Sequence, residues 1–217
     1  MQFSDKQLFI QKFFEEFERK IARLQELYAK SYKDEAFTLC LVYIDRLASG
    51  HYGGEQENHK NFCRALKELS GNPLFGMIHP RKLLELTKAK CSSAASLMES
   101  IVNRQPQALL KEDELAQEIR NSSLTDGEKD GVISNLWRAS MASSCYAYIR
   151  NPEVHGPGSG GLDFDETIYE GKKGVSLDFE VLYDALDKIF RRIWAISIEG
   201  SQWFGNPDYI KRLYGRL

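Results

Sequence analysis

The sequence predicts an all-α fold, a helical bundle with a small β-hairpin inserted before the last long helix. Two observations predict it. Apolar residues recur at helical spacing over most of the 217 residues, and only the stretch around residues 162–177 offers two short strand-like segments. The hydrophobic fraction of 42% and the six prolines are typical of a folded chain. At this length we expect a single domain over residues 1–217.

Seven helical segments are expected in order. They run over about Asp5 to Tyr32, from Phe37 to a stop at Ser49-Gly50, Asn58 to Ser70, Pro80 to Asn103, Leu109 to Ile119, about Glu128 to Pro152, and Phe179 through Ile196. The polar residues 121–127 and the glycine-rich residues 156–161 are expected to be loops. We expect the first helix to pack on its own domain, with a coiled-coil pairing to another chain as the alternative.

The hairpin and the C-terminal tail complete the pattern. Leu162 to Tyr169 and Val175 to Leu177 flank Gly171-Lys172-Lys173-Gly174 and are expected to pair. The aromatic-rich residues 203–210 follow the last long helix. We expect this tail to pack on the chain's own core, and coverage of an exposed groove or a dimer contact is the alternative.

Composition excludes several classes of protein. The net charge of -2 gives no global attraction to polyanions, so any nucleic-acid contact needs a local basic patch. The four cysteines form no Cys-x-x-Cys pair and no zinc-finger spacing with histidine, which predicts buried free thiols, no metal site and no cofactor. No apolar run is long enough for a membrane span and no signal peptide is recognisable, so we expect a cytoplasmic protein with no membrane partner.

One stretch carries a distinctive set of chemical groups. Arg150 and His155 are separated by four residues, between a predicted helix end at Pro152 and a glycine-rich loop. Neutral imidazole can act as a general base or acid near neutral pH, and a guanidinium can hold two phosphate oxygens. The same spacing recurs at Arg46 and His51, within an amphipathic run. The polar neighbour and the following glycines favour the copy at Arg150 and His155.

The residues from Arg150 to Gly156 resemble the motif of the HEPN superfamily, in which Arg, a polar residue and His are spaced in this way. The resemblance extends over residues 33–197 through the early helix at 42–48, the helix at Asn61-Phe62 and the hairpin after the histidine. This part of the sequence is similar to the plasmid-borne and abortive-infection-type branches of that superfamily. Residues 1–32, the N-terminal helix, and residues 198–217, the C-terminal tail, lie outside it.

This resemblance implies a metal-independent endoribonuclease used in toxin or phage-defence systems. His155 would activate the ribose 2′-hydroxyl or protonate the leaving oxygen, Arg150 would stabilise the charged phosphorane, and Asn151 would orient the scissile phosphate. Glu153 or Asp45 would support the site. The expected partners are an RNA substrate, a second copy in a homodimer, and an antitoxin or defence-system protein.

Two alternatives stay open from the sequence. Some HEPN relatives are non-catalytic binding modules that act through protein or nucleotide interactions. The chain could also be an unrelated helical regulator in which the motif is a coincidence, with His155 a loop histidine and Arg150 a cap at the helix end.

Overall fold

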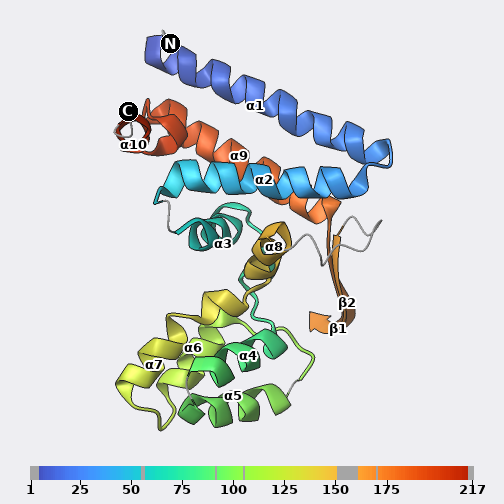
Figure 1. Cartoon of the computed structure of the whole chain (residues 1–217), viewed down its shortest axis with the longest axis vertical. Helices are drawn as coiled ribbons and strands as arrows, with labels where there is room; N and C mark the ends of the chain where they lie inside the picture. The colour runs from blue at the N-terminus through green and yellow to red at the C-terminus, as the bar shows by residue number, and fades with distance from the viewer. Residues whose placement is uncertain are drawn as a thin grey trace. The chain divides into compact units, whose positions relative to one another are not determined.

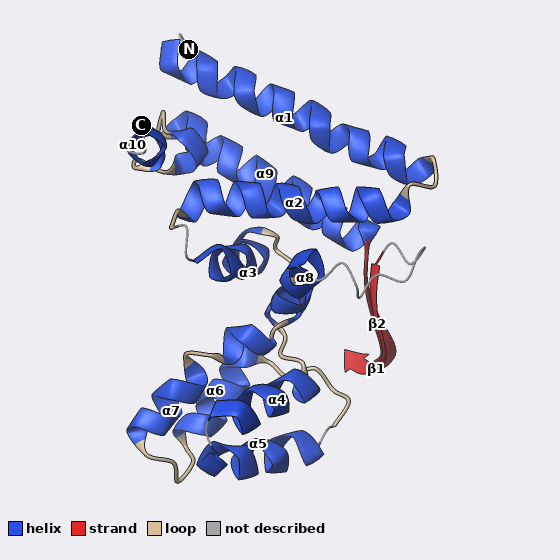
Figure 2. Ribbon diagram, in the orientation of Figure 1, coloured by secondary structure: helices blue, strands red, loops and turns tan. Residues whose placement is uncertain are grey.

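The computed structural model describes residues 5–54, 57–90, 92–104, 106–150, 161–169 and 171–214. It confirms a mostly helical chain with two short strands immediately before the last long helix (Figures 1 and 2). The elements are α1 Asp5–Ala29, α2 Lys33–Tyr52, α3 Asn58–Leu69, α4 Pro80–Lys90, α5 Ser92–Arg104, α6 Glu112–Arg120, α7 Asp126–Ile133, α8 Met141–Arg150, β1 Gly161–Tyr169, β2 Lys172–Asp178, α9 Phe179–Glu199 and α10 Tyr209–Tyr214, with 3₁₀ turns η2 Pro73–Gly76, η3 Leu136–Ala139 and η5 Trp203–Gly205. Within the described ranges no helix combines the length and the hydrophobicity that a membrane span requires.

Contacts between backbone segments divide the chain into two compact units. The first comprises the described residues of 1–72, 148–162 and 177–217, and so contains α1, α2, α3, α9, η5 and α10. The second comprises the described residues of 73–147 and 163–176, with α4 to α7, most of α8 and most of the hairpin. The expectation of a single domain stays a prediction.

Helix α2 is central to the first unit, because it packs against α1, α3 and α9. Its buried positions recur at helical spacing, as do those of α1 and α9. Burying one large apolar side chain stabilises a fold by roughly 1.5–3 kcal/mol, so the three facing stripes supply much of the stability of this unit. The largest fully buried side chains here are Ile10, Phe14, Leu24, Phe37, Leu41, Ile44, Leu47, Phe62, Phe179, Phe190 and Phe204.

Phe204 anchors the C-terminal segment to this core. Its ring lies 5.5 Å from the ring centroid of Phe13 and 5.8 Å from that of Phe14, both in edge-on geometry, and the residue is 1% exposed. Its φ of 55° is in the left-handed region, which costs a non-glycine residue about 1–2 kcal/mol. Burial of the ring offsets that cost. The prediction that the tail packs on its own core is confirmed for Phe204.

The end of α2 differs from the prediction. A stop at Ser49-Gly50 was expected, but the helix continues to Tyr52 and ends at Gly53, whose φ is 75°. Gly50 is therefore a helix-interior residue. A Cβ atom there would lie 2.5–2.8 Å from three ring carbons of Phe204, so the absent side chain makes room for the aromatic ring. The sequence pattern indicated a helix stop at Gly50, although the packing of Phe204 requires this glycine.

We predict that Gly50→Ala lowers stability although alanine is the better helix former. The steric clash with the buried Phe204 ring costs roughly 1–3 kcal/mol, which exceeds the propensity gain of about 1 kcal/mol. Gly131→Ala in α7 is the matched control, because a Cβ atom there meets nothing within 4 Å and the substitution should be neutral or stabilising. Thermal unfolding followed by circular dichroism checks both, and a Gly50→Ala melting temperature at or above that of the wild type would contradict the packing role.

The second unit has its own apolar core and a small set of paired backbone segments. Helices α4 and α5 pack against each other, so the helical run predicted over Pro80 to Asn103 is present as two helices. Ile78 bridges to Leu110 and to Ser140 in antiparallel fashion. The core residues are Ile78, Leu83, Met98, Ile101, Val102, Leu115, Ala116, Ile119, Leu136 and Ala139.

The predicted hairpin is confirmed. Strands β1 and β2 form a two-stranded sheet, and Gly171 and Gly174 near the turn have φ values of 77° and 86°. Ile168 of β1 also pairs in parallel with Ala108, where the Leu109 N–H donates to the Ile168 carbonyl at 2.9 Å. This pairing lies within the second unit and joins the hairpin to the segment before α6.

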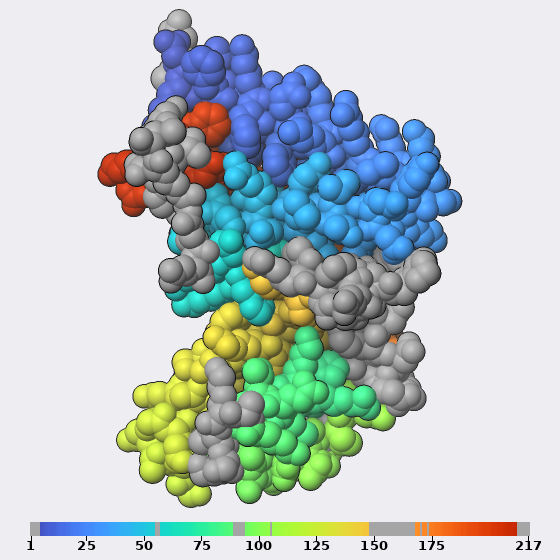
Figure 3. Space-filling view, in the orientation of Figure 1, coloured from blue at the N-terminus to red at the C-terminus, as the bar shows by residue number. Residues whose placement is uncertain are grey.

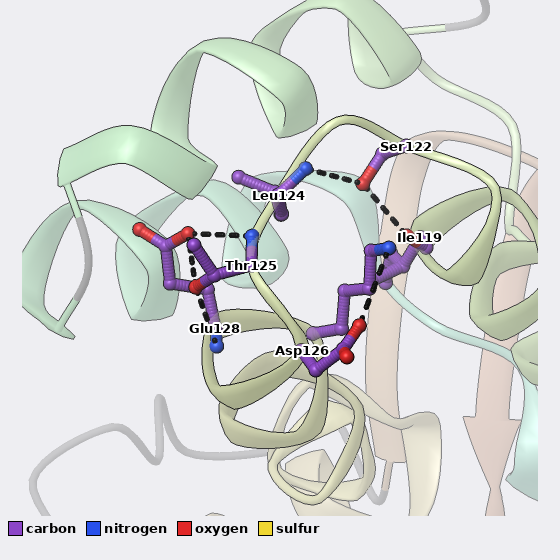
Figure 4. A network of polar contacts seen from close by, with 7 residues as sticks. Ile119, Ser122, Leu124, Thr125, Asp126 and Glu128 are labelled. Atoms are coloured by element: carbon purple, nitrogen blue, oxygen red, sulfur yellow. Dashed lines mark hydrogen bonds and ion pairs between the residues drawn. The ribbon is translucent and has the colours of Figure 1, made fainter.

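The predicted loop is present at 121–125, but the single helix predicted from about Glu128 to Pro152 is wrong. The structure has three helical pieces, α7, η3 and α8, and α7 already begins at Asp126. Thr125 and Glu128 form a capping box, in which the threonine hydroxyl accepts from the Glu128 N–H at 3.4 Å and the glutamate accepts from the Thr125 N–H at 2.9 Å (Figure 4). Farther on, Ser140 is extended at ψ 159°, which separates η3 from α8.

We predict that Thr125→Ala loosens α7 without unfolding the protein. Loss of an N-cap costs about 1 kcal/mol, and none of the residues of α7 is buried, so little packing compensates. Backbone amides of 126–133 should exchange with deuterium several-fold faster, because about 1 kcal/mol corresponds to roughly a fivefold change in the opening equilibrium. Ser123→Ala, at an exposed loop position nearby, should leave the exchange unchanged. Equal exchange in both variants would show that the cap does not hold the helix.

Candidate functional site

Helix α8 carries the start of the predicted motif. Ser140 precedes the helix, and its hydroxyl accepts from the Ser143 N–H at 3.2 Å as an N-cap. The Met141 N–H donates to the Met77 carbonyl at 2.9 Å, which fixes the first turn to the loop after η2. Met141 and Cys145 are fully buried, so one face of the helix is held in the core of the second unit. The helix ends at Arg150.

The described part of α8 extends to Arg150. Pro152, which is predicted to terminate the helix, lies outside the described residues. The side chain of Arg150 lies outside the part of the chain that the structure describes, as do Asn151, Glu153 and His155. Their roles stay predictions.

Asp45, the other proposed supporting residue, lies on α2. It is half-buried, and its Oδ1 atom is fully shielded from solvent. Asp45 and Arg150 belong to the same compact unit. A carboxylate held in this way can accept a hydrogen bond from a histidine or arginine, which is the function predicted for it.

The second Arg-x4-His pair has a structural role that sequence reasoning did not find. The Arg46 guanidinium donates to the Tyr209 hydroxyl at 3.0 Å and lies 5.8 Å from the centroid of the Phe204 ring. His51 Nδ1 donates to the Phe204 carbonyl at 2.7 Å, since a carbonyl oxygen can only accept. Both side chains therefore hold the C-terminal segment on α2.

Asn206 completes this attachment. Its amide donates to the carbonyl of Gly50 at 3.2 Å and to that of His51 at 2.7 Å. These carbonyls belong to the last turn of α2, which has no intrahelical donors left for them. The tail thus caps the helix that it packs on. The aromatic residues at 203–210 signalled that the tail packs, but no sequence pattern indicated the cap.

The described cysteines are buried free thiols, as predicted for Cys40, Cys63 and Cys145. Burial raises the pKa of Cys145 to about 12, although the Lys82 cation opposes that shift. Burial also raises the pKa of Cys40 well above its usual range, and the Glu180 carboxylate adds to that effect. Neither thiol is a nucleophile near neutral pH, because the thiolate is the reactive form. Over the described residues no group of three or more His, Cys, Asp or Glu could hold a metal ion.

Comparisons of this chain with models of protein families, with curated proteins and with solved structures give no match.

Among the described histidines, His79 has a shifted pKa that should appear in the pH dependence of stability. Burial lowers its pKa below the ordinary value, the Lys82 and Arg81 cations lower it further, and Glu85 opposes them. The unfolded chain therefore binds a proton near pH 6.5 that the folded chain does not. The free energy of unfolding therefore falls as the pH drops below about 6.5, because the unfolded chain takes up this proton more readily than the folded chain. Above about pH 6.5 His79 is neutral in both states and has no such effect.

We therefore predict that His79→Asn flattens the decline in melting temperature between about pH 7 and pH 5. The measurement is thermal unfolding of both proteins across that range. Because asparagine does not titrate, its curve should depend less on pH whether or not the substitution changes stability at pH 7. Parallel curves for the two proteins would show that His79 is not the group responsible.

Proposed function

We propose that this protein is a metal-independent endoribonuclease of the HEPN type, acting as a toxin or phage-defence effector. The observation that carries the proposal is the pairing of Arg150 and His155 across four residues, with Arg150 at the end of α8. The role of the other such pair supports it. Arg46 and His51 hold the tail on α2, so that pair has a structural role and the pair at Arg150 and His155 is the one proposed for catalysis.

In the proposed reaction His155 takes the proton of a ribose 2′-hydroxyl, whose oxygen attacks the adjacent phosphorus. The bond from phosphorus to the 5′-oxygen breaks, and the leaving oxygen receives a proton from a histidine in its imidazolium form. Arg150 stabilises the charge on the pentavalent phosphorane, and Asn151 orients the phosphate. The products are a 2′,3′-cyclic phosphate and a 5′-hydroxyl.

The proposed site is composite, with the motifs of two subunits in a homodimer meeting at one cleft. This arrangement supplies two histidines, one for each proton transfer. Glu153 and Asp45 are the carboxylates available to orient a histidine or an arginine within the site. Of these two, Asp45 lies within the described residues, where its Oδ1 is buried on the central helix α2.

The test is to incubate wild type and His155→Ala with total RNA in the presence of EDTA and to map the cleaved ends. We predict cleavage by the wild type that leaves cyclic-phosphate ends, and a loss of at least a hundredfold in the variant, which is the typical contribution of one general acid or base. Arg150→Ala should show a similar loss of cleavage rate, because the charge on the phosphorane is then no longer stabilised.

His51→Ala is the matched control from the other Arg-x4-His pair. It removes the hydrogen bond to the Phe204 carbonyl, so its melting temperature should fall while its cleavage rate at low temperature stays near that of the wild type. If no protein cleaves RNA, or if wild type and His155→Ala cleave equally, the ribonuclease proposal fails. A non-catalytic helical binding module is then the function to pursue.

A further inference from the structure

A groove runs along the first unit between α1 and α2, away from the predicted motif in the sequence. It encloses about 590 Å³. On the α1 side its lining residues are Phe13, Phe17, Lys20, Arg23, Leu24 and Leu27. Phe17 and Leu24 belong to the stripe that α1 buries in the core, so the other lining residues form the part of the groove that a partner can reach. Figure 3 shows α1 and α2 next to each other on the surface of this unit.

The α2 side of the groove is apolar and partly open. Leu39 and Tyr43 are half-buried, and Val42 is 41% exposed, which makes it one of the few large apolar side chains of the described chain that face solvent. On the other wall Leu24 is fully buried and Leu27 half-buried. The floor is therefore formed, and aliphatic side chains of a partner could bury themselves on it without rearranging the core.

The charged residues that line the groove are all cations. Lys20, Arg23 and Arg46 are exposed, and no carboxylate belongs to the described lining. Lys20 and Arg23 take part in no ion pair among the described residues, whereas Glu16 and Glu18 of α1 each pair with an arginine. A partner that carries acidic side chains beside its apolar ones would match this arrangement.

The aromatic rings in the groove argue against single-stranded RNA as the occupant. Phe17 is 6% exposed, and its ring stacks on that of Phe190 at 5.9 Å with 13° between the planes. Phe13 is engaged by the rings of Phe14, Trp203 and Phe204. Base recognition by stacking requires an accessible ring face, and both phenylalanines are used by the protein's own core.

We propose that the groove between α1 and α2 binds an acidic amphipathic helix of another protein. The lining residues of α1 from Phe13 to Leu27 span about 21 Å, the length of roughly four helical turns. The bound helix places aliphatic side chains on Leu27, Leu39 and Val42 and directs its carboxylates to Lys20 and Arg23. This site is independent of the ribonuclease proposal, since it contains none of the motif residues.

The test uses three fluorescein-labelled helical peptides of about 16 residues, long enough to cover the groove. All carry leucines at heptad spacing, and their flanking positions are glutamate, glutamine or lysine. Binding to the full chain is measured by fluorescence anisotropy. We expect the glutamate peptide to bind at least tenfold more tightly than the lysine peptide, with the glutamine peptide between them.

Two pairs of variants locate the site. Lys20→Glu combined with Arg23→Glu should weaken binding of the glutamate peptide by about tenfold or more. Lys12→Glu, at an exposed position on α1 outside the groove, should leave that binding unchanged. Val42→Glu should abolish binding, while Phe9→Glu, also an exposed apolar position but outside the groove, should not. Circular dichroism melts verify that all variants are folded.

Several outcomes would overturn the proposal. They are no binding by any peptide, equal binding by all three, or binding that the groove variants leave intact. Two other occupants are tested, a second copy of this chain and RNA. Sedimentation of the wild type and of Val42→Glu tests the first. A dimer that Val42→Glu dissociates would assign the groove to a second copy of this chain. RNA binding that the Lys20 and Arg23 variant removes, without peptide binding by the wild type, would assign it to nucleic acid.

Discussion

The packing of the Phe204 ring against the bare backbone of Gly50 is the contact on which the first unit depends. It joins the last part of the chain to the central helix α2, and through Phe13 and Phe14 it also reaches α1. The ring can approach this closely only because position 50 has no side chain. The left-handed backbone at Phe204 is the local cost of directing the ring inward, and the burial of the ring offsets it.

The polar groups around this contact follow from it. Once the tail lies against the end of α2, the Asn206 amide reaches the free carbonyls of the last turn, and His51 and Arg46 reach Phe204 and Tyr209. Hydrogen bonds of this kind each contribute about 1 kcal/mol net, so they orient the segment more than they hold it. The aromatic burial supplies the larger share.

Much of the fold could be predicted from the sequence, because long amphipathic stripes specify helices with little help from tertiary context. The stripes of α1 and α9 are examples. The hairpin around Gly171 was predicted from its flanking strand-like segments and turn residues. The errors occurred where a short-range signal competed with the stripe. Gly50 looked like a helix stop although packing required it, and the apolar periodicity after Val132 continued through Ser140, where the backbone is extended.

The candidate site was predictable to a lesser degree. Pro152 predicts the end of α8 because a proline restricts the residue before it, and the described part of that helix extends to Arg150. The choice between two Arg-x4-His pairs rested only on neighbouring residues, and contacts far apart in sequence supplied a role for the pair at Arg46 and His51. Spacing alone could not separate them, since a pair that fixes a tail and a pair that binds a phosphate can have the same separation along the chain.

The order of the elements along the chain has a consequence for biosynthesis. The first unit combines α1, α2 and α3 with α9 and the segment that contains Phe204, and the whole second unit is encoded between them. The ribosome therefore makes α2 long before it makes the helix and the ring that cover its apolar face. The second unit, by contrast, draws most of its core from one continuous stretch and can collapse while synthesis continues. The first unit is completed only after α9 and Phe204 have been made, so the apolar face of α2 stays uncovered in the nascent chain until then.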